Sequence, residues 1–293
     1  MGEGRPGDGA AKAMQNTKCT VAVNGVMGRM GSTVLAAVCG APDMEPSGGA
    51  DVKASAATLS RPDGKGQVPL AKDLGSLFRE RKPQVVVDFT NGEAAVHAME
   101  TAINAGVRVV SGSTGVKPAE LERIGKLAAA KKTGVISASN FALGAVLLGH
   151  LAGIAAKYFE YADLIESHHE AKIDSPSGTA LSIARSMAEG RGSPFKSVVS
   201  EKETLAGARG GVHQGINIHS ARMPGRVARH EVVFGATGQT LTLIHDSINR
   251  ESFMPGVLLA IRHVMTLDHM VVGLDNVLGL PRSASSGQEK AKP

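Results

Sequence analysis

The sequence contains no tryptophan, and aromatic residues of all kinds make up only 3% of its 293 residues. Proteins that hold single-stranded nucleic acids stack the bases on aromatic side chains, so no nucleic-acid partner is expected. Two cysteines, Cys19 and Cys39, are too few for a metal cage or a disulfide framework. Long apolar runs are missing as well. None approaches the roughly 18 residues of a membrane-spanning helix, so no membrane partner is expected.

Neither sign of charge is in large excess, since 32 Lys and Arg residues against 27 Asp and Glu residues leave a net charge of +5. The basic residues are dispersed, which suits an anionic substrate or cofactor better than a nucleic-acid surface. A length of 293 residues is typical of about two domains, and a hydrophobic content of 42% is ordinary for a globular protein. Residues 1–17 lack the apolar segment of a secretory signal, so we expect a flexible tail there and a second one over 281–293. The expected location is the cytoplasm, or a plastid if the source is a plant.

Glycine, by contrast, is abundant, with 36 residues, and three of them lie in one turn near the start of the chain. We expect a strand over Thr20–Val23 and a helix over Ser32–Val38, joined by this turn. In a dinucleotide-binding turn, Gly25 makes the tight turn, Gly28 leaves room for a pyrophosphate and Gly31 lets the helix pack on the strand. The spacing Gly-x-x-Gly-x-x-Gly departs from the usual Gly-x-Gly-x-x-Gly, so a plain strand-turn-helix corner remains an alternative.

An acidic residue follows this turn at the distance where a Rossmann domain binds the adenosine ribose, which is about 20 residues. This residue is Asp51, and Lys53 lies close enough to contact a 2′-phosphate. An acid favours NADH, and a nearby lysine tolerates NADPH. The residues alone therefore leave the cofactor preference open.

Apolar strands and helices alternate up to about residue 137. This alternation predicts a doubly wound parallel sheet, which binds ligands at the carboxyl ends of its strands. Two polar segments lie at such ends, Asp88-Phe89-Thr90 and Gly112-Ser113-Thr114-Gly115, and we place them against ribose and nicotinamide. Ordinary turn chemistry is the alternative. The expected strands are Gln84–Phe89, Val107–Ser111 and Val135–Ser137, and the expected helices are Glu93–Asn104 and Pro118–Lys131.

The second half of the chain contains its most chemically dense segment, from His168 to Thr179. It follows an expected helix over Phe141–Phe159, for which Asn140 is the expected N-cap, and an expected strand over Tyr161–Ser167. Another helix, Ala180–Glu189, is expected directly after it.

Within this segment, an imidazole beside an ammonium group suits proton donation near neutral pH, and His168 with Lys172 offers that pair. Ser177, Gly178 and Thr179 are expected to offer free amides that bind an anion at a helix start. A self-capped helix start is the alternative. Adjacent histidines on a strand point to opposite faces, so His168 and His169 are not expected to bind a metal.

The remainder is rich in expected strands, with Ile216–Arg222 followed by a hairpin of Arg229–Phe234 and Gln239–Asp246. An open sheet leaves a face to be covered, and a second copy of the chain is a natural cover, which favours a homo-oligomer. A final helix over Ser252–Val264 is expected to return the chain to the first domain.

Five segments occur in one order along the chain and together resemble the 4-hydroxy-tetrahydrodipicolinate reductase family, also called dihydrodipicolinate reductases, of diaminopimelate and lysine synthesis. The similarity extends over about residues 18–280, and the histidine-rich segment is its most specific part. The segments are Gly25-Val26-Met27-Gly28-Arg29-Met30-Gly31, Asp88-Phe89-Thr90, Gly112-Ser113-Thr114-Gly115, Ser139-Asn140-Phe141 and His168-His169-Glu170-Ala171-Lys172-Ile173-Asp174-Ser175-Pro176-Ser177-Gly178-Thr179.

The resemblance implies a Rossmann-type doubly wound parallel sheet over residues 18–139 plus 251–280. An α/β domain with an open mixed sheet, residues 140–250, interrupts it, carries the substrate site and forms a homotetramer. The implied reaction is the NAD(P)H-dependent reduction of 4-hydroxy-tetrahydrodipicolinate to tetrahydrodipicolinate with loss of water. No metal is implied.

The resemblance also implies residue roles. His168 is the proton donor and Lys172 its charged partner. The small dicarboxylate substrate is held by His169, Lys172, Ser177, Gly178 and Thr179. Many family members carry arginine after the ribose-binding acid, where this chain has Val52, so we expect a tilt towards NADH. The cofactor residues are Gly25, Val26, Met27, Gly28, Arg29, Met30, Gly31, Asp51, Lys53, Phe89, Thr90, Gly112, Ser113, Thr114, Ser139, Asn140, Phe141 and Arg250.

Three other interpretations of the sequence remain. The first is a different NAD(P)-dependent reductase, one that acts on an imine or an amino-acid aldehyde. The second is a non-enzymatic nucleotide sensor with a Rossmann core, and the third is a purely structural oligomer. A covalent aldehyde dehydrogenase needs a nucleophilic cysteine, for which Cys19 and Cys39 are poorly placed. A sensor predicts a DNA-binding module, and the sequence shows no helix-turn-helix pattern.

Overall fold

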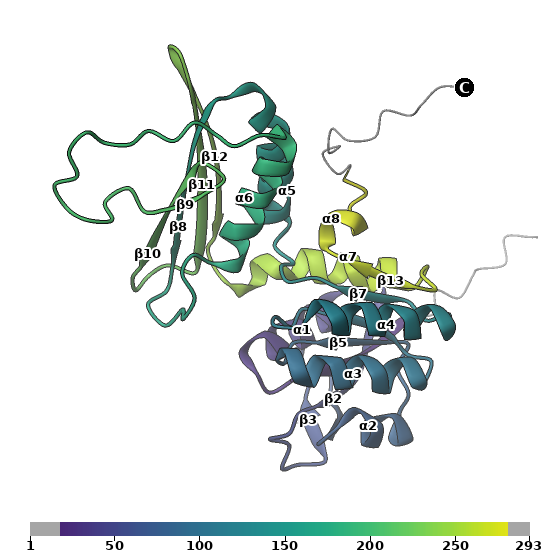
Figure 1. Ribbon diagram of the computed structural model, residues 1–293. Helices are drawn as coiled ribbons and strands as arrows, with labels where there is room; N and C mark the ends of the chain where they lie inside the picture. Colours follow the sequence, from purple (N-terminus) through teal and green to yellow (C-terminus); the bar gives the residue numbers. More distant parts are fainter. Residues whose placement is uncertain (1–17, 281–293) are drawn as a thin grey trace, which may run out of the picture.

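The computed structural model describes residues 18–280 and places them in two lobes (Figure 1). One lobe is built on an eight-stranded sheet with the spatial order β13-β7-β6-β5-β1-β2-β4-β3, the other on a five-stranded sheet with the order β12-β11-β8-β10-β9. The tails expected over 1–17 and 281–293 lie outside the described residues. Across residues 18–280, none of the helices has the length and apolar character needed to cross a bilayer.

The first sheet is parallel except where β3 pairs with β4. Its central strands are valine-rich and buried on both faces, as expected for a sheet covered by helices on each side. Its strands are β1 (Cys19–Asn24), β2 (Met44–Ala50), β3 (Thr58–Ser60), β4 (Gln67–Ala71), β5 (Val85–Asp88), β6 (Arg108–Ser111), β7 (Val135–Ser137) and β13 (Met270–Val272).

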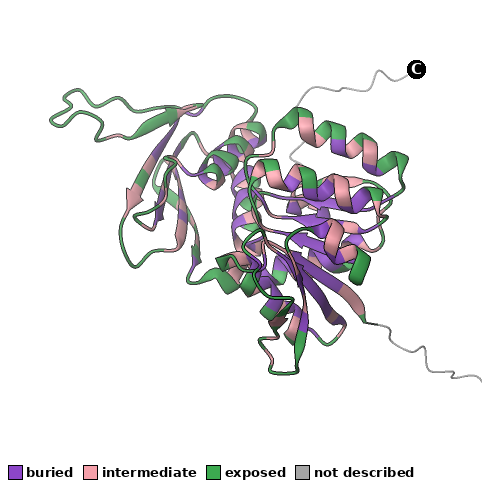
Figure 2. Cartoon of the chain, turned by 90° about the horizontal axis from the view of Figure 1, so that it is seen from below, coloured by how far each residue is buried: buried purple, intermediate pink, exposed green. Residues whose placement is uncertain are grey.

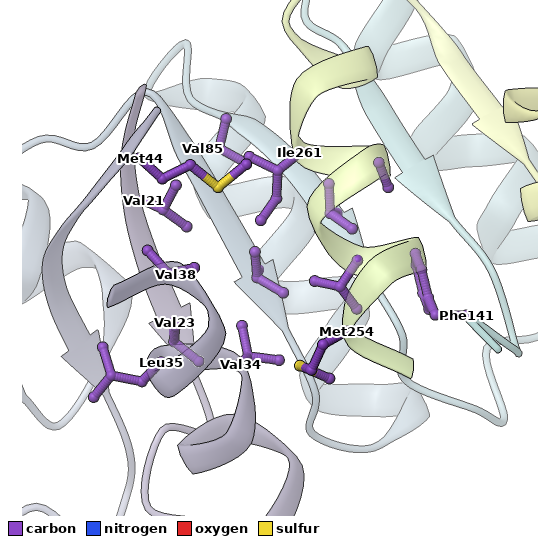
Figure 3. Close-up of a cluster of buried hydrophobic side chains, with 14 of the residues drawn as sticks. Val21, Val23, Val34, Leu35, Val38, Met44, Val85, Phe141, Met254 and Ile261 are labelled. Carbon is purple, nitrogen blue, oxygen red and sulfur yellow. The ribbon is translucent and has the colours of Figure 1, made fainter. Parts of the chain in front are cut away.

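Helices cover both faces of this sheet and create two separate cores. Successive residues of a strand face opposite layers, so Val21 and Val23 belong to one core and Ala22 to the other. In Figure 3, Met254 and Ile261 of the late helix α7 pack beside Val34 and Val38 of α1, so the end of the chain completes the first core. The helices of this lobe are α1 (Arg29–Gly40), α2 (Leu74–Glu80), α3 (Gly92–Asn104), α4 (Pro118–Ala130), α7 (Met254–Val264) and α8 (Leu274–Val277).

The second sheet is mixed, because β8 pairs parallel to β10 and antiparallel to β11. Helices α5 and α6 lie together along this sheet, and its core joins residues of both helices to β8, β10 and β11. Along β12, exposed and partly buried positions alternate, and Figure 2 shows this lobe as less buried than the first sheet. The elements are α5 (Leu143–Ala155), a 3₁₀ turn (Ala156–Tyr158), β8 (Tyr161–His168), α6 (Gly178–Arg191), β9 (Gly211–His213), β10 (Ile216–Arg222), β11 (Ala228–Ala236), β12 (Gln239–Ser247) and a second 3₁₀ turn (Arg250–Phe253).

Two expected helices begin later than predicted. The helix expected from Phe141 begins at Leu143 and ends at Ala155, because Phe141 is drawn into the first core, only 1% exposed and 5.9 Å from the Phe89 ring centre. The prediction that Asn140 is its N-cap was therefore wrong, and its side chain accepts instead from the Ala142 amide at 2.8 Å. Similarly, the helix expected from Ser252 begins at Met254, after the second 3₁₀ turn.

Candidate active site

The glycine turn connects β1 to α1 with close contacts between backbone atoms. Gly25 has a φ of +75°, which only glycine adopts readily, and a Cβ on Gly31 would lie 2.0 Å from the Gly25 carbonyl oxygen. Helix α1 starts three residues earlier than predicted, so Arg29, Met30 and Gly31 form its first turn and Gly28 is the N-cap. In the described chain, no side chain caps this end and no acidic residue lies in the first turn. The turn therefore fits the pyrophosphate of a dinucleotide.

The ribose-binding acid predicted from the sequence lies beside this turn. Asp51 follows β2, and β2 pairs parallel to β1, so the two carboxyl ends are neighbours. The Asp51 carboxylate accepts from the backbone amides of Met27 and Lys53, each at 3.0 Å. Val26 is buried beneath, while Val52 is 85% exposed. The structure thus brings Met27, Asp51 and Lys53 together at one edge.

A buried carboxylate, Asp88, organises the next two strand ends, and it begins one of the two segments predicted to lie against ribose and nicotinamide. Asp88 is 0% exposed and accepts from Asn24 Nδ2 at 2.8 Å and from the hydroxyl groups of Thr90, Ser111 and Ser113 at 2.7–3.0 Å. Four hydrogen bonds compensate for burying this group. Asp88 therefore fixes the loops after β5 and β6, which carry the predicted nicotinamide residues.

The remaining predicted cofactor residues are not all gathered in one place. Phe89 packs against Gly112, where a Cβ would lie 2.2 Å from its ring, and the ring also faces Phe141. Asn140 Nδ2 lies 3.2 Å from Thr179 Oγ1, which joins the two lobes. Thr114 and Ser139 are exposed, and both line a cavity of about 190 Å³ beside the ends of β6 and β7. Arg250 is also exposed, on the 3₁₀ turn that contacts α1.

The histidine-rich segment follows β8 and leads into α6. His168 is the last residue of β8 and is 7% exposed, whereas His169 is half-buried just beyond the strand. Lys172 Nζ contacts Asp174 Oδ1 at 2.5 Å, and this hydrogen bond lowers the pKa of Asp174. The second oxygen of Asp174 accepts from the Gly178 amide at 3.2 Å. A carboxylate of the chain thus bridges Lys172 and the start of α6.

The expectation of free amides at the start of α6 was wrong in part, and the self-capped alternative is the one the structure shows. The helix begins at Gly178, two residues before the predicted start, with Ser177 as N-cap. The Ser177 amide donates to Glu166 at 3.2 Å, and its hydroxyl accepts from Ala180 at 3.1 Å. Because Ser177 is only 1% exposed, its polar atoms serve the interior of the lobe. Its assignment to substrate binding stays a prediction.

Sequence reasoning missed two further charged residues beside His168. Glu166 is 0% exposed and lies 2.5 Å from His168 Nδ1, while Arg222 of β10 donates to both of its oxygens at 2.9 and 3.0 Å. Burial raises the pKa of Glu166, but the hydrogen bonds from His168 and Arg222 outweigh it and lower the pKa to about 2. The signal for Glu166 was present, since residues two apart on a strand share a face. Arg222 follows only from the pairing of β8 with β10.

His230 of β11 is the other buried titratable group here. Its ring lies edge-on to that of His168, with 5.3 Å between centroids, and its Nε2 is 3.2 Å from Ser177 Oγ. Burial lowers the pKa of His230 to about 4, and the charge of His168 adds to the effect. His230 is therefore neutral in the folded chain at neutral pH.

Acid is expected to destabilise the fold through His230. An unfolded histidine binds a proton below about pH 6.5, but folded His230 does so only near pH 4, so stability present above pH 6.5 is lost as the pH falls towards 4. The loss is about 3 kcal/mol in the free energy of unfolding. Urea unfolding across this pH range measures it, and His230→Gln should flatten the dependence by a comparable amount. An equally steep dependence in the variant would contradict the prediction.

A cavity along α5 and α6 does not contain the histidine pair. It measures about 640 Å³, lies along α5, α6 and α8, and includes Ser139, Asn140 and Thr179 at one end. Neither His168 nor Lys172 lines it. The buried titratable groups Glu166, His168 and His230 gather at the end of β8 instead.

Comparison with known proteins decides the family. The sequence model described as "Dihydrodipicolinate reductase, N-terminus" matches residues 19–141, and that described as "Dihydrodipicolinate reductase, C-terminus" matches residues 144–278. The chain belongs to the dihydrodipicolinate reductase family. The family resemblance inferred from five short segments is thereby confirmed.

Similar proteins agree with this family. The 4-hydroxy-tetrahydrodipicolinate reductase of Dehalococcoides mccartyi strain CBDB1 is 45% identical over 264 residues, covering 90% of this chain and 100% of that protein. Its counterpart from Geobacillus kaustophilus is 46% identical, covering 88% of this chain and 98% of that protein. Among solved structures, the dipicolinate-bound dihydrodipicolinate reductase from Paenisporosarcina sp. TG-14 superposes with a TM-score of 0.79 at 40% identity, covering 89% and 99% of the two chains. The expected fold class, a Rossmann-type sheet with a second mixed sheet, is confirmed.

Proposed function

We propose that this chain reduces 4-hydroxy-tetrahydrodipicolinate to tetrahydrodipicolinate with NADH or NADPH, in the diaminopimelate route to lysine. One observation carries the proposal. The family-specific segment from His168 to Thr179 lies at the start of α6, with a buried imidazole and an ammonium group beside it. The reductases named above align with this chain over nearly their whole length.

The substrate is a small dicarboxylate, and the donors that we assign to it are His169, Lys172, Gly178 and Thr179. Support comes from Asp174, whose carboxylate contacts both Lys172 Nζ and the Gly178 amide, so these donors are spaced to hold one carboxylate. A substrate carboxylate takes these contacts by displacing Asp174. The homologue from Paenisporosarcina binds dipicolinate, which is also a dicarboxylate.

Each residue has a defined part in the reaction. When bound, the cofactor supplies a hydride to C4 of the substrate ring, after the hydroxyl group has left as water to give a conjugated imine. Lys172 stabilises negative charge as it moves through the conjugated system. His168 delivers or relays the proton that C3 receives. The two lobes around the substrate exclude water and align the reacting atoms.

The residues at the ribose edge favour NADH and tolerate NADPH. We expect Lys53→Gln to lower kcat/KM with NADPH by about fivefold, the loss of roughly 1 kcal/mol for an exposed ion pair. The value with NADH should not change, because Asp51 and its amide contacts remain. Lys65→Gln, an exposed lysine on the β3–β4 loop, is the matched control. Equal losses with both cofactors would contradict this role for Lys53.

The proposed assembly is a homotetramer formed through the second sheet, and the proposed location is the cytoplasm. The partly exposed alternate positions of β12 support a face that another copy covers. Light scattering on the purified protein measures the mass. A monomer at assay concentration would contradict the proposed homotetramer but would not bear on the proposed reaction.

Nicotinamide absorbance measured with the purified chain tests the reaction. The substrate is labile and is generated in the cuvette by the upstream synthase, from pyruvate and aspartate semialdehyde, with NADH and NADPH run in parallel. Oxidation that depends on this chain is the expected result. Binding of NADH without oxidation would keep the Rossmann domain but redirect the search to other imine or aldehyde substrates.

A further inference from the structure

Glu166 is a fully buried carboxylate that no step above uses. It precedes His168 by two residues on β8, so both side chains lie on one face of the strand. Burying an isolated carboxylate is costly, and here Arg222 offsets the cost by binding both oxygens. A buried ion pair often adds no more stability than well-packed apolar residues do. Its place beside the proposed proton donor therefore calls for a reason other than stability.

We propose that Glu166, held in place by Arg222, is a positioning residue that orients His168 and stabilises its protonated ring. The proposal rests on the proposed function, because it requires a proton donor. Its geometric basis is the contact of 2.5 Å between Glu166 Oε2 and His168 Nδ1.

This contact decides which nitrogen of His168 gives up the proton. In the neutral ring, Nδ1–H donates to Glu166 and Nε2 carries the lone pair, whereas the protonated ring has a hydrogen on both nitrogens. Proton delivery breaks the Nε2–H bond, and its electron pair stays on nitrogen. The new C3–H bond uses the electron pair of the conjugated substrate. The ring then returns to the neutral tautomer that Glu166 already favours.

The other groups around His168 leave this role to Glu166. The Arg222 guanidinium is directed to Glu166 and to the Asp174 carbonyl oxygen, which it contacts at 2.7 Å. His230 faces His168 from β11 and is neutral at neutral pH, because burial lowers its pKa to about 4. Lys172 and Asp174, in the following loop, pair with each other.

Glu166 also connects three elements of the site. Its Oε1 accepts from the Ser177 amide at the start of α6 at 3.2 Å, as well as from Arg222 of β10. His168, Arg222 of the neighbouring strand β10 and the start of α6 thus all contact the Glu166 carboxylate. A shift of this carboxylate therefore moves the proton donor relative to the carboxylate-binding donors.

Glu166→Gln tests the charge while keeping the shape. We expect kcat to fall about 10- to 100-fold with KM for the substrate nearly unchanged, and the alkaline limb of the pH profile of kcat to move down by about one pH unit. Glu166→Asp keeps the negative charge but places the carboxylate further from His168. We therefore expect kcat to fall while the alkaline limb of its pH profile stays at the same pH. Glu231→Gln on β11 is the control, since the Glu231 carboxylate pairs with Arg229 at 3.0 Å. It should leave kcat and the limb unchanged. An unmoved limb in Glu166→Gln would overturn the proposal.

A second measurement does not depend on turnover and is made on the wild-type protein. Nitrogen-15 NMR of histidine-labelled wild-type protein, with the His168 signal assigned by its loss in His168→Gln, reports the neutral tautomer. Hydrogen on Nδ1 is expected, and hydrogen on Nε2 would overturn the proposal. If the wild-type chain binds NADH but fails to reduce the substrate, the proposed function fails, and the tautomer still tells whether Glu166 orients the ring.

Discussion

His168→Ala and Lys172→Ala are each expected to lower kcat by about 100- to 10,000-fold, the usual contribution of a positioned proton donor or charge stabiliser. His168 has the buried carboxylate of Glu166 behind it, and Lys172 is connected through Asp174 to the Gly178 amide at the start of α6. The Kd for NADH should change little, because both residues lie outside the glycine turn. Stopped-flow turnover together with fluorescence titration of NADH separates the two quantities.

His269→Ala is the matched control for the first of these variants. The Nδ1 atom of His269 also lies beside a carboxylate, that of Asp268 at 2.8 Å, but His269 is exposed and follows α7. Its replacement should leave kcat unchanged. Wild-type turnover in His168→Ala would remove His168 from the reaction, and unchanged turnover in Lys172→Ala would do the same for Lys172.

Gly31→Ala is expected to raise the Kd for NADH by about 10- to 100-fold and to lower the melting temperature. Its new Cβ would lie 2.0 Å from the Gly25 carbonyl oxygen and 2.8 Å from Val26 Cα, so backbone has to move. Overpacking of this kind costs about 1–3 kcal/mol, which corresponds to that range in Kd if the strain falls on the turn. Calorimetric titration with NADH and thermal unfolding measure the two effects.

Gly40→Ala, at the other end of α1, is the control for this variant. Among the described residues, nothing lies within 4 Å of a Cβ at Gly40. Alanine has the higher helix propensity, so a small rise in stability and an unchanged Kd are expected. If Gly31→Ala binds NADH as the wild type does, the turn is a plain strand-turn-helix corner.

Sequence reasoning succeeded where the determinants are local. Valine-rich segments such as Val85–Val87 predict buried parallel strands. In the turn from Gly25 to Gly31, glycine itself is required, by a positive φ at Gly25 and by a close backbone contact at Gly31. Strand β2 was missed because its residues, Met44–Ala50, include two glycines and a proline and do not look like a strand. The reason for the glycines lies elsewhere in the chain. A Cβ at Gly49 would meet Val26 at 2.6 Å, and one at Gly48 would meet Leu77 at 2.7 Å.

The sequence by itself determined the family, the alternation of strands and helices, and the order of the chemically active segments, because all of these are carried by neighbouring residues. The tertiary structure alone decided what stands next to His168. Arg222 and His230 are 54 and 62 positions further along the chain, and they reach His168 only because β10 and β11 flank β8. Strand order and register follow from the packing of the whole lobe. The charge environment of the proton donor is therefore a property of the fold.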